Sequence, residues 1–447
     1  MDTPPLLAST PLSFVMPHFE SAVLSNGTPV YIVPSATKDV LTITFAMRHG
    51  ACHDDVPGET CLTLEMLKQG TERHTAREFN EEVESRGCWI RCAADHDIST
   101  VQVTGLGEWF DDVTDLMADC VLRPRFDAEE LDKLRARSVA DMMIDLSDVD
   151  WLASRAATQG AFTTHPYARP REGTPASLGA ITVDNLRKVH RQLLAAPRWI
   201  IVAGPVEPQK AVKRLETLFS ALQPSGQPQP MPPAVKSRAL GIVASNEGAL
   251  QTSFRIILPG LPMGHPDYAA AQLLTNVLGG FTLARLFTIL REEKGYTYGA
   301  YASPMVRPLD ASIVISTSVG NEFTADTIAT IAQEVSRLGS QRIDEDELEN
   351  ARQHIVGSFA RSCETPQQTA WLLHTIVNYE LPFDYFEQYV RRVQELAPDD
   401  LLPVQSTLFS TSSWVVGAAG VTALVESAIS PFVGSVSHWD RKGFERP

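Results

Sequence analysis

"VDNLRKVHRQLLAAPRWIIVAGPV", residues 183–206, recurs later in the chain as "PDDLLPVQSTLFSTSSWVVGAAGV", residues 398–421. In each copy an aspartate (Asp184 or Asp399) lies 15 residues before a tryptophan (Trp199 or Trp414) that opens a β-branched run. A long stretch that returns with the same internal spacing indicates that one structural unit occurs twice. The sequence therefore predicts a duplicated fold.

Two further blocks repeat in the same order. "FDAEELDKLR" at 126–135 recurs as "IDEDELENAR" at 343–352, and "ESRGCWIRCAAD" around Gly87 corresponds more weakly to "REEKGYTYGAYA" around Gly295. The two copies are offset by 215 residues for the block at 183–206, by 217 for the block at 126–135 and by 208 for the block around Gly87. An ordered set of matches with so little drift indicates two copies of a domain rather than chance similarity.

A proline-rich segment separates the copies. "QPSGQPQPMPPA", residues 223–234, contains five prolines and no regular periodicity, which is typical of a semi-rigid extended spacer. We therefore predict an N-terminal domain over residues 1–222, a linker over 223–238 and a C-terminal domain over 239–447.

Short strands and long helices alternate irregularly within each half. Strands such as "STVQVTG" and "ASIVISTS" accompany amphipathic helices such as "AREFNEEVESRG". The absence of strict strand–helix–strand alternation favours an α+β fold. Each domain should contain a mainly antiparallel β-sheet packed with α-helices.

Composition excludes some partners. The chain has 447 residues and a formal net charge of -16, which disfavours nucleic acid and anionic membranes as partners. The most apolar stretch, "WVVGAAGVTALVESAISPFV", contains Glu426 and two glycines, so we expect a core strand and helix there rather than a membrane span. "MDTPPLLAST" lacks the features of a signal peptide. The protein is then cytoplasmic, or periplasmic if a leader has been removed.

The stretch "CLTLEMLKQGT", residues 61–71, predicts one buried helix that ends in a turn. Cys61 and Glu65 stand four residues apart and share a helical face. That face is either the remnant of a metal site or the charged edge of a core helix. The other cysteines, including the pair Cys88 and Cys92, are too few and too scattered for a disulfide scaffold and are expected to be core thiols.

Two stretches resemble a known family. "RHGACHDDVPGETCLTLEMLKQGTERHTAREFNEEVESRG", residues 48–87, is similar to the N-terminal signature of the pitrilysin and insulinase metallopeptidases, which include the mitochondrial processing peptidases. "LFTILREEKGYTYGAYAS", residues 286–303, resembles the signature of their second half. The resemblance covers nearly all of the chain, including the duplication and the linker.

The resemblance implies a zinc helix of the form H-x-x-E-H, with two histidine ligands and a glutamate base. In this chain the motif falls on Cys61, Leu62, Thr63, Leu64 and Glu65, so both histidines are absent and Leu64 stands at the base position. The third ligand position falls on Asp141. Cys61, Glu65 and Asp141 carry sulfur and oxygen atoms, but Leu64 cannot accept a proton from water. We therefore predict that this chain binds no metal and is inactive alone.

The signature at residues 286–303 has its arginine and tyrosine in place. The resemblance implies that an arginine and a tyrosine seven residues apart, here Arg291 and Tyr298, reach the zinc centre of a partner. Read without the family, Arg291 would complement a helix dipole near Lys294, and Tyr298 would be a core aromatic on a strand. We expect Gly295 to take the left-handed conformation after the helix, and Tyr296 and Tyr298 to share one face of the next strand.

These observations predict the zinc-free subunit of a heteromeric zinc metallopeptidase acting on unfolded peptides. The partner would be a homologous subunit with an intact H-x-x-E-H motif, which would carry the zinc. The short "LGGFTLA", residues 278–284, lacks the long glycine-rich loop of the mitochondrial alpha subunit and favours a bacterial-type heterodimer. Two alternatives are a purely structural subunit, like the core proteins of the bc1 complex, and a self-sufficient hydrolase that uses Cys61 as ligand or nucleophile.

Overall fold

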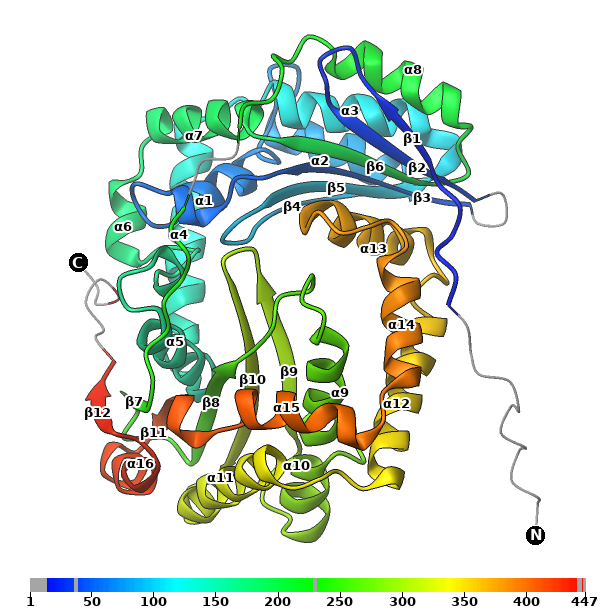
Figure 1. The fold of residues 1–447 in the computed structure, drawn as a ribbon. Helices are drawn as coiled ribbons and strands as arrows, with labels where there is room; N and C mark the ends of the chain where they lie inside the picture. Colours follow the sequence, from blue (N-terminus) through cyan, green and yellow to red (C-terminus); the bar gives the residue numbers. More distant parts are fainter. Residues whose placement is uncertain (1–13, 36–38, 228–230, 440–443, 445–447) are drawn as a thin grey trace, which may run out of the picture.

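The computed structural model describes residues 14–35, 39–227, 231–439 and 444. Two six-stranded sheets lie one above the other (Figure 1). The first sheet has the order β1-β2-β6-β3-β5-β4 and consists of β1 Glu20–Val23, β2 Pro29–Pro34, β3 Val40–Met47, β4 Trp89–Ala94, β5 Ser99–Leu106 and β6 Arg198–Gly204. The second has the order β12-β7-β11-β8-β10-β9 and consists of β7 Leu240–Ser245, β8 Gln251–Pro259, β9 Ala300–Arg307, β10 Asp310–Gly320, β11 Val415–Gly420 and β12 Ser435–His438.

Most strand pairs are antiparallel. In the first sheet only β2 and β6 run parallel, and in the second β7 runs parallel to both β11 and β12. The last residues of β6 and β11 are Gly204 and Gly420, with φ angles of 144° and 155°. The α+β prediction with two related, mainly antiparallel units is confirmed.

The structure corrects one detail of the repeat. Gly204 and Gly420 are 216 residues apart, so Trp199 corresponds to Val415 rather than to Trp414. Trp199 lies on the face of β6 that is turned toward the C-terminal half, where it packs near His374 at a ring distance of 5.5 Å. Trp414 precedes β11 and lies in the second core, where its indole N–H donates to Phe432. The two tryptophans align in sequence but occupy different positions.

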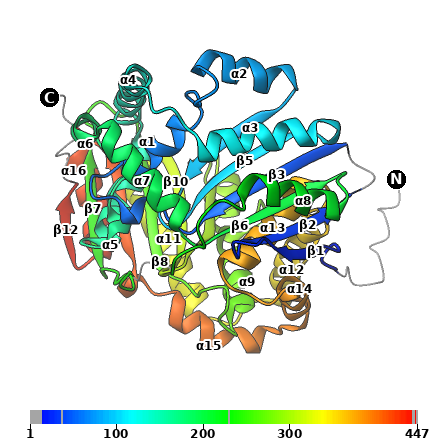
Figure 2. The ribbon, with the colours of Figure 1, turned by 90° about the horizontal axis from the view of Figure 1, so that it is seen from above.

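The first half contributes the following helices, most of which cover one face and one end of the first sheet. They are α1 Glu59–Met66, α2 Ala76–Ser85, α3 Phe110–Leu122, α4 Ala128–Asp145, α5 Val149–Phe162, α6 Pro175–Ala180, α7 Val183–Ala195 and α8 Pro208–Phe219. Figure 2 shows α3, α7 and α8 over the outer face of this sheet. The apolar faces of these three helices join the strands in one core.

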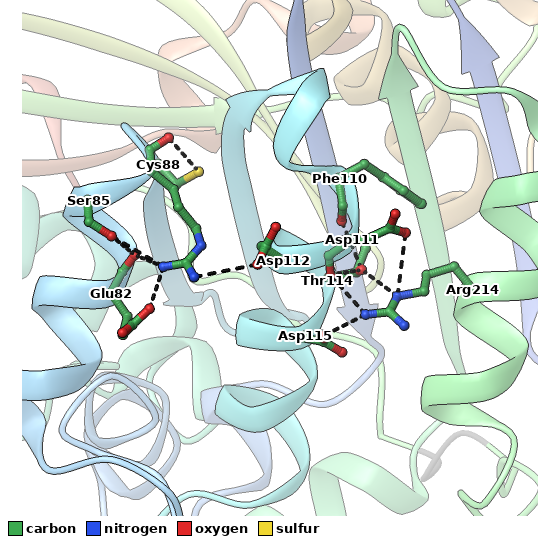
Figure 3. A network of polar contacts seen from close by, with 10 residues as sticks. Glu82, Ser85, Cys88, Phe110, Asp111, Asp112, Thr114, Asp115 and Arg214 are labelled. Carbon is green, nitrogen blue, oxygen red and sulfur yellow. Dashed lines mark hydrogen bonds and ion pairs between the residues drawn. The ribbon is translucent and has the colours of Figure 1, made fainter.

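Polar contacts tie α8 to α3 at the surface. Arg214 of α8 donates to the Thr114 hydroxyl at 3.2 Å and to the Asp111 carbonyl at 2.9 Å, and it pairs with Asp115 at 2.6 Å (Figure 3). Each of these surface contacts contributes little by itself. Together they fix the register of two helices whose apolar faces already share the core.

The helices of the second half repeat this arrangement. They are α9 Tyr268–Gly279, α10 Arg285–Phe287 with the π-helical turn Thr288–Glu293, α11 Thr324–Ser340, α12 Glu345–Ala360, α13 Pro366–Asn378, α14 Tyr385–Glu395, α15 Pro398–Leu408 and α16 Thr422–Ile429. Short 3-10 turns occur at Ala51–His53, Gly107–Trp109, Pro166–Ala168, Asn321–Phe323, Thr411–Ser413 and Ser430–Phe432.

The apolar stretch near the C-terminus forms β11 and α16, as predicted. Among the described residues, none of the helices is both long enough and apolar enough to cross a membrane. The expectation about a leader concerns residues 1–10, which lie outside the described part of the chain.

One helix from each half packs on the sheet of the other half. α5 packs on β7, β8 and β11 of the second sheet, while α13 packs on β2, β3 and β6 of the first. Asp150 at the start of α5 accepts from Arg255 of β8 at 2.7 Å. Ala370 and Leu373 of α13 share a cluster with Ile201 of β6. The halves are therefore held together by buried contacts as well as by the linker.

The linker makes backbone contacts along its described part. Gly226 donates to the Ala195 carbonyl at 2.7 Å, Ala234 to the Leu309 carbonyl at 3.2 Å, and Ser237 to the Ala161 carbonyl at 2.9 Å. Neither a helix nor a strand forms over residues 223–227 and 231–238. The predicted boundaries 1–222, 223–238 and 239–447 stay a prediction.

Limited proteolysis checks these boundaries. We expect the first cut within residues 223–234 or at a terminus, because exposed segments without regular structure are cleaved first. Because α5 and α13 are exchanged between the halves, the two fragments should co-elute in native gel filtration and separate only in denaturant. Early cleavage inside β6, every residue of which is buried, would contradict the assignment.

Candidate functional site

Three of the four residues at the family's metal positions line one cleft. Cys61 and Glu65 of α1 and Asp141 of α4 border a cavity of about 600 Å³, which β4 and residues 170–173 complete. Residues from two helices that are far apart in the sequence thus border the same cavity. Leu64 is not part of the lining.

The local sequence explains the orientation of α1. Gly58, with φ of 99°, precedes the helix in a left-handed conformation that favours glycine. The Asp54 carboxylate accepts hydrogen bonds from the backbone N–H groups of Gly58 and Thr60, both at 3.1 Å, and so satisfies two donors at the helix start. Leu64 is 0% exposed and belongs to the core of the first half. The position that would need a base therefore faces away from the cleft.

The polar groups in the cleft are already engaged or neutral. Glu65 pairs with Lys68 in the turn that follows α1 at 2.9 Å, and Asp141 lies 4.0 Å from Arg137. Burial, with a contribution from the negative charge of Glu172, raises the pKa of the Cys61 thiol well above its usual value. A cysteine binds zinc as a thiolate, so this environment opposes its role as a ligand.

These residues do not fit a zinc ion. Within the described ranges, none of the clusters of three or more histidine, cysteine, aspartate or glutamate side chains has the geometry to hold a metal. A catalytic zinc needs three protein ligands and an open position, and a base must then accept the proton of its water. The motif positions offer a thiol with a raised pKa and a carboxylate paired with a lysine, and the position of the base is a leucine outside the cleft.

We expect the purified chain to contain substoichiometric zinc and to show no chelator-sensitive peptidase activity. Substituting Cys61→His, Leu64→Glu and Glu65→His together should not restore full activity. Asp141 still occupies the third position, and Leu64→Glu would place a carboxylate in an apolar core. Elemental analysis of the wild-type chain checks the first expectation, and stoichiometric, tightly bound zinc would overturn it.

Arg291 and Tyr298 lie outside this cleft, in the second half. Arg291 belongs to the π-helical turn and stacks on Phe287 with its guanidinium carbon 4.7 Å from the ring centroid. Tyr298 lies in the loop before β9, and its side chain is 93% exposed. Tyr298 is therefore not a core aromatic. Neither residue lines the α1–α4 cleft of its own chain.

The predicted strand over Tyr296 and Tyr298 is wrong, because β9 begins only at Ala300. Gly295 follows the turn with φ of 69°, as expected. Tyr296 then stacks on Phe323 at a centroid distance of 4.1 Å, which fixes one side of the loop. The two tyrosines therefore differ: Tyr296 anchors the loop, and Tyr298 projects from it.

The other side of the loop is fixed by hydroxyl groups. Thr317 of β10 donates to the Gly299 carbonyl at 3.0 Å and to the Thr297 hydroxyl at 3.2 Å. Lys294 donates to the Thr330 hydroxyl of α11 at 2.8 Å. A side chain that is exposed on a loop anchored at both ends is presented in a defined place.

Comparison with known proteins places this geometry in a family. The model described as "Insulinase (Peptidase family M16)" matches residues 30–174, and "Peptidase M16 inactive domain" matches residues 180–355. This chain belongs to the insulinase family of peptidases, M16.

Curated relatives within the family carry differing names. An "Uncharacterized zinc protease" of Rickettsia bellii is 24% identical over 89% of this chain and 96% of that protein. The "Non-peptidase homolog YmxG" of Helicobacter pylori is 22% identical over 75% of this chain and 78% of that protein. The M16 family therefore includes relatives named for peptidase activity and for its absence.

Solved structures share the fold. A Pseudomonas fluorescens structure described as a peptidase M16 inactive domain superposes with a TM-score of 0.85, at 22% identity over 91% of this chain and 98% of that chain. A protease from Helicobacter pylori gives a TM-score of 0.80 at 18% identity, over 91% of this chain and 100% of that chain. At these identities the likeness shows the architecture alone.

Sequence reasoning missed some residues of the cleft. Lys68 neutralises Glu65, and the i, i+3 spacing in "CLTLEMLK" was a signal for that pair. Arg171 and Glu172, which pair with each other at the cleft wall, come from a loop about a hundred residues away, and nothing in their local sequence predicts that position.

Proposed function

We propose that this chain is the zinc-free subunit of a heteromeric M16 peptidase acting on unfolded peptides, and that it supplies Arg291 and Tyr298 to its partner's active site. The observation that carries the proposal is the exposed Tyr298 on an anchored loop. The metal-motif cleft of the same chain lacks a base, so a retained pair of this kind has a use only in another subunit.

The partner would be a homologous chain with an intact H-x-x-E-H motif, which would hold the zinc and the general base. The Tyr298 hydroxyl would donate a hydrogen bond to the oxyanion that develops on the scissile carbonyl. Such a donor accelerates the reaction because it is oriented before the charge appears. No hydrogen bond joins this hydroxyl to the described residues, so its donor is free for a substrate.

Arg291 would bind a carbonyl or carboxylate of the substrate. Its guanidinium plane is oriented by the Phe287 ring, and its Nε lies 3.6 Å from the Glu292 carboxylate. Stacking occupies the face of a guanidinium and leaves N–H donors at its edge. Charge-assisted hydrogen bonds from these donors would hold the peptide in line for attack.

A purely structural subunit is the second candidate. The relative from Helicobacter pylori that is named a non-peptidase homolog favours it. The two candidates differ in one measurement, the peptidase activity of the zinc-binding homologue from the same organism with and without this chain. Activity that depends on this chain supports the shared site. If the partner is equally active alone, this chain is not part of the catalytic machinery.

A further inference from the structure

We propose that a second cavity, at the junction of the two halves, binds a ligand with a carboxylate next to an apolar group. This junction cavity has a volume of about 450 Å³ and is lined by residues that include Arg48, Arg307, Asp97, Met231, Met263 and Leu309. It lies apart from the α1–α4 cleft and from Arg291 and Tyr298, so the inference goes beyond the proposed function.

Arg307, the last residue of β9, makes no direct ion-pair contact with the described residues, although its charge interacts through space with the carboxylates of Asp95 and Asp97. Its guanidinium carbon lies 4.7 Å from the Tyr167 ring centroid and 5.9 Å from that of Phe162. Among the described residues, its side chain has neither a hydrogen bond nor an ion pair, and its Nη1 is buried. An arginine held by its face against aromatic rings keeps its edge donors for a planar anion. The guanidinium nitrogens of Arg307 other than Nη1 are therefore the donors available to a ligand in the cavity.

Arg48 supplies a second donor from the other half. Its Nη2 donates to the carbonyls of Val377 and Asn378 at 3.2 and 3.1 Å, and its Nη1 pairs with Glu380. These contacts hold the guanidinium at the C-terminal end of α13. Its Nε is buried and has no acceptor within the described part of the chain. Two arginines from different halves thus line one cavity, each with an unused buried N–H.

The lining also contains two acidic residues, Glu380, which is paired with Arg48, and Asp97. Its two carboxylate oxygens accept from the Tyr167 hydroxyl at 2.9 and 2.7 Å. Burial raises the pKa of the Asp97 carboxyl above its usual value. The Tyr167 hydroxyl is therefore hydrogen-bonded to Asp97, and the ring of the same tyrosine packs against the Arg307 guanidinium. The Asp97 carboxylate is thus engaged by the Tyr167 hydroxyl.

The rest of the lining sets the ligand class. Met231, Met263 and Leu309 give the cavity apolar walls, and the volume suits a molecule of the size of an amino acid or a short peptide end. An N-acylated apolar amino acid has both features: a carboxylate for the arginine donors and an apolar side chain for the apolar walls. The same chemistry occurs at the C-terminus of a peptide, so two sources share it.

Isothermal titration calorimetry with the full chain tests the site. N-acetyl-leucine is expected to bind about tenfold or more tightly than N-acetyl-leucinamide, which has the same shape and no charge. Acetate should bind more weakly than N-acetyl-leucine because it leaves the apolar walls unfilled. Equal affinities for the acid and the amide, or no binding of either at millimolar concentration, would overturn the proposal.

Variants separate the site from general charge effects. Arg307→Gln should bring the affinity for N-acetyl-leucine down to that for the amide, and Arg307→Lys should give an intermediate value. Arg77→Gln, which removes one exposed arginine of α2, is the charge-matched control and should bind like the wild type. An Arg77→Gln loss equal to that of Arg307→Gln would refute the assignment. The acid–amide comparison uses the wild-type chain and stands even if an Arg307 variant does not fold.

An N-acetylated tripeptide ending in leucine distinguishes the two sources. If the tripeptide acid binds as tightly as N-acetyl-leucine, the site accepts peptide C-termini. If the tripeptide is excluded and N-acetyl-leucine is retained, the site takes small carboxylates. Both outcomes support a carboxylate site, and binding of the tripeptide amide as tightly as its acid would contradict it.

Discussion

Tyr298→Phe is expected to lower the kcat of the proposed heterodimer by about 10²–10³-fold while leaving its assembly unchanged. The substitution removes one hydroxyl that has no hydrogen bond to the described residues, and the ring of Tyr298 is already 93% exposed. The fold and the loop should therefore not change. A donor used mainly in the transition state affects kcat and kcat/KM alike.

The measurement needs a saturating amount of the mutant subunit, so that weak association is not mistaken for lost chemistry. Tyr301→Phe is the matched control. Tyr301 lies on β9, is also exposed, and packs its ring near Phe287 at 5.7 Å, a contact that phenylalanine keeps. The control should retain the wild-type kcat. If the Tyr298→Phe variant turned over peptide at the wild-type rate, Tyr298 would not stabilise the oxyanion.

Arg291→Ala should chiefly raise KM, because the guanidinium is expected to hold the substrate in the ground state as well. Some loss of kcat follows if the peptide moves out of line. If both the Arg291 and Tyr298 variants assemble and turn over peptide at the wild-type rate, the shared-site mechanism is wrong and the structural alternative remains.

The repeats predicted the architecture because each copy retains its own strand and helix patterns. The run at 198–204 forms a central strand that is buried on both faces, and its copy forms β11. The exchange of α5 and α13 was not predicted. Hydrophobic periodicity shows that a helix has a buried face but not which sheet covers it.

The strand predicted over Tyr296 and Tyr298 does not form, and the reason is local. The alternating pattern over Tyr296 and Tyr298 predicts a strand, but strand pairing decides where a strand begins. The ladder between β9 and β10 starts with Ala300 opposite Thr317. Residues before Ala300 follow the hydrogen bonds of Thr297 and Gly299 instead. The resemblance of residues 286–303 to the family's second signature implied the pair Arg291 and Tyr298, whereas the exposure of Tyr298 needed the structure.

A signal for the α5 exchange lies in its small residues. Ala153, Ala156 and Ala157 of α5 are buried, and Gly417 of β11 lies directly beneath them. A Cβ atom at Gly417 would come within 2.5 Å of the Ala153 carbonyl oxygen and 2.6 Å of the Ala157 Cα. Helix and strand are thus packed backbone against backbone, which only glycine at position 417 permits.

Gly417→Ala is therefore expected to destabilise the protein by about 1–3 kcal/mol, because the helix must move away from the sheet to admit one methyl group. Gly357→Ala is the matched control. Gly357 lies inside α12, where an added Cβ would meet no atom within 4 Å. There the same substitution should stabilise by up to about 1 kcal/mol, since alanine is the better helix former. The midpoints of urea unfolding measure both effects.

The pair also tests the exchange of helices between the halves. Because α5 belongs to the first half of the chain and covers the second sheet, loosening it should weaken both halves. The Gly417→Ala variant should therefore unfold at lower urea when followed by probes in either half, and no transition of one half alone should remain at the wild-type midpoint. Gly417→Ala and Gly357→Ala midpoints that move in the same direction would contradict the close packing of α5 on β11. A wild-type midpoint retained by the first half would show that α5 does not couple the two.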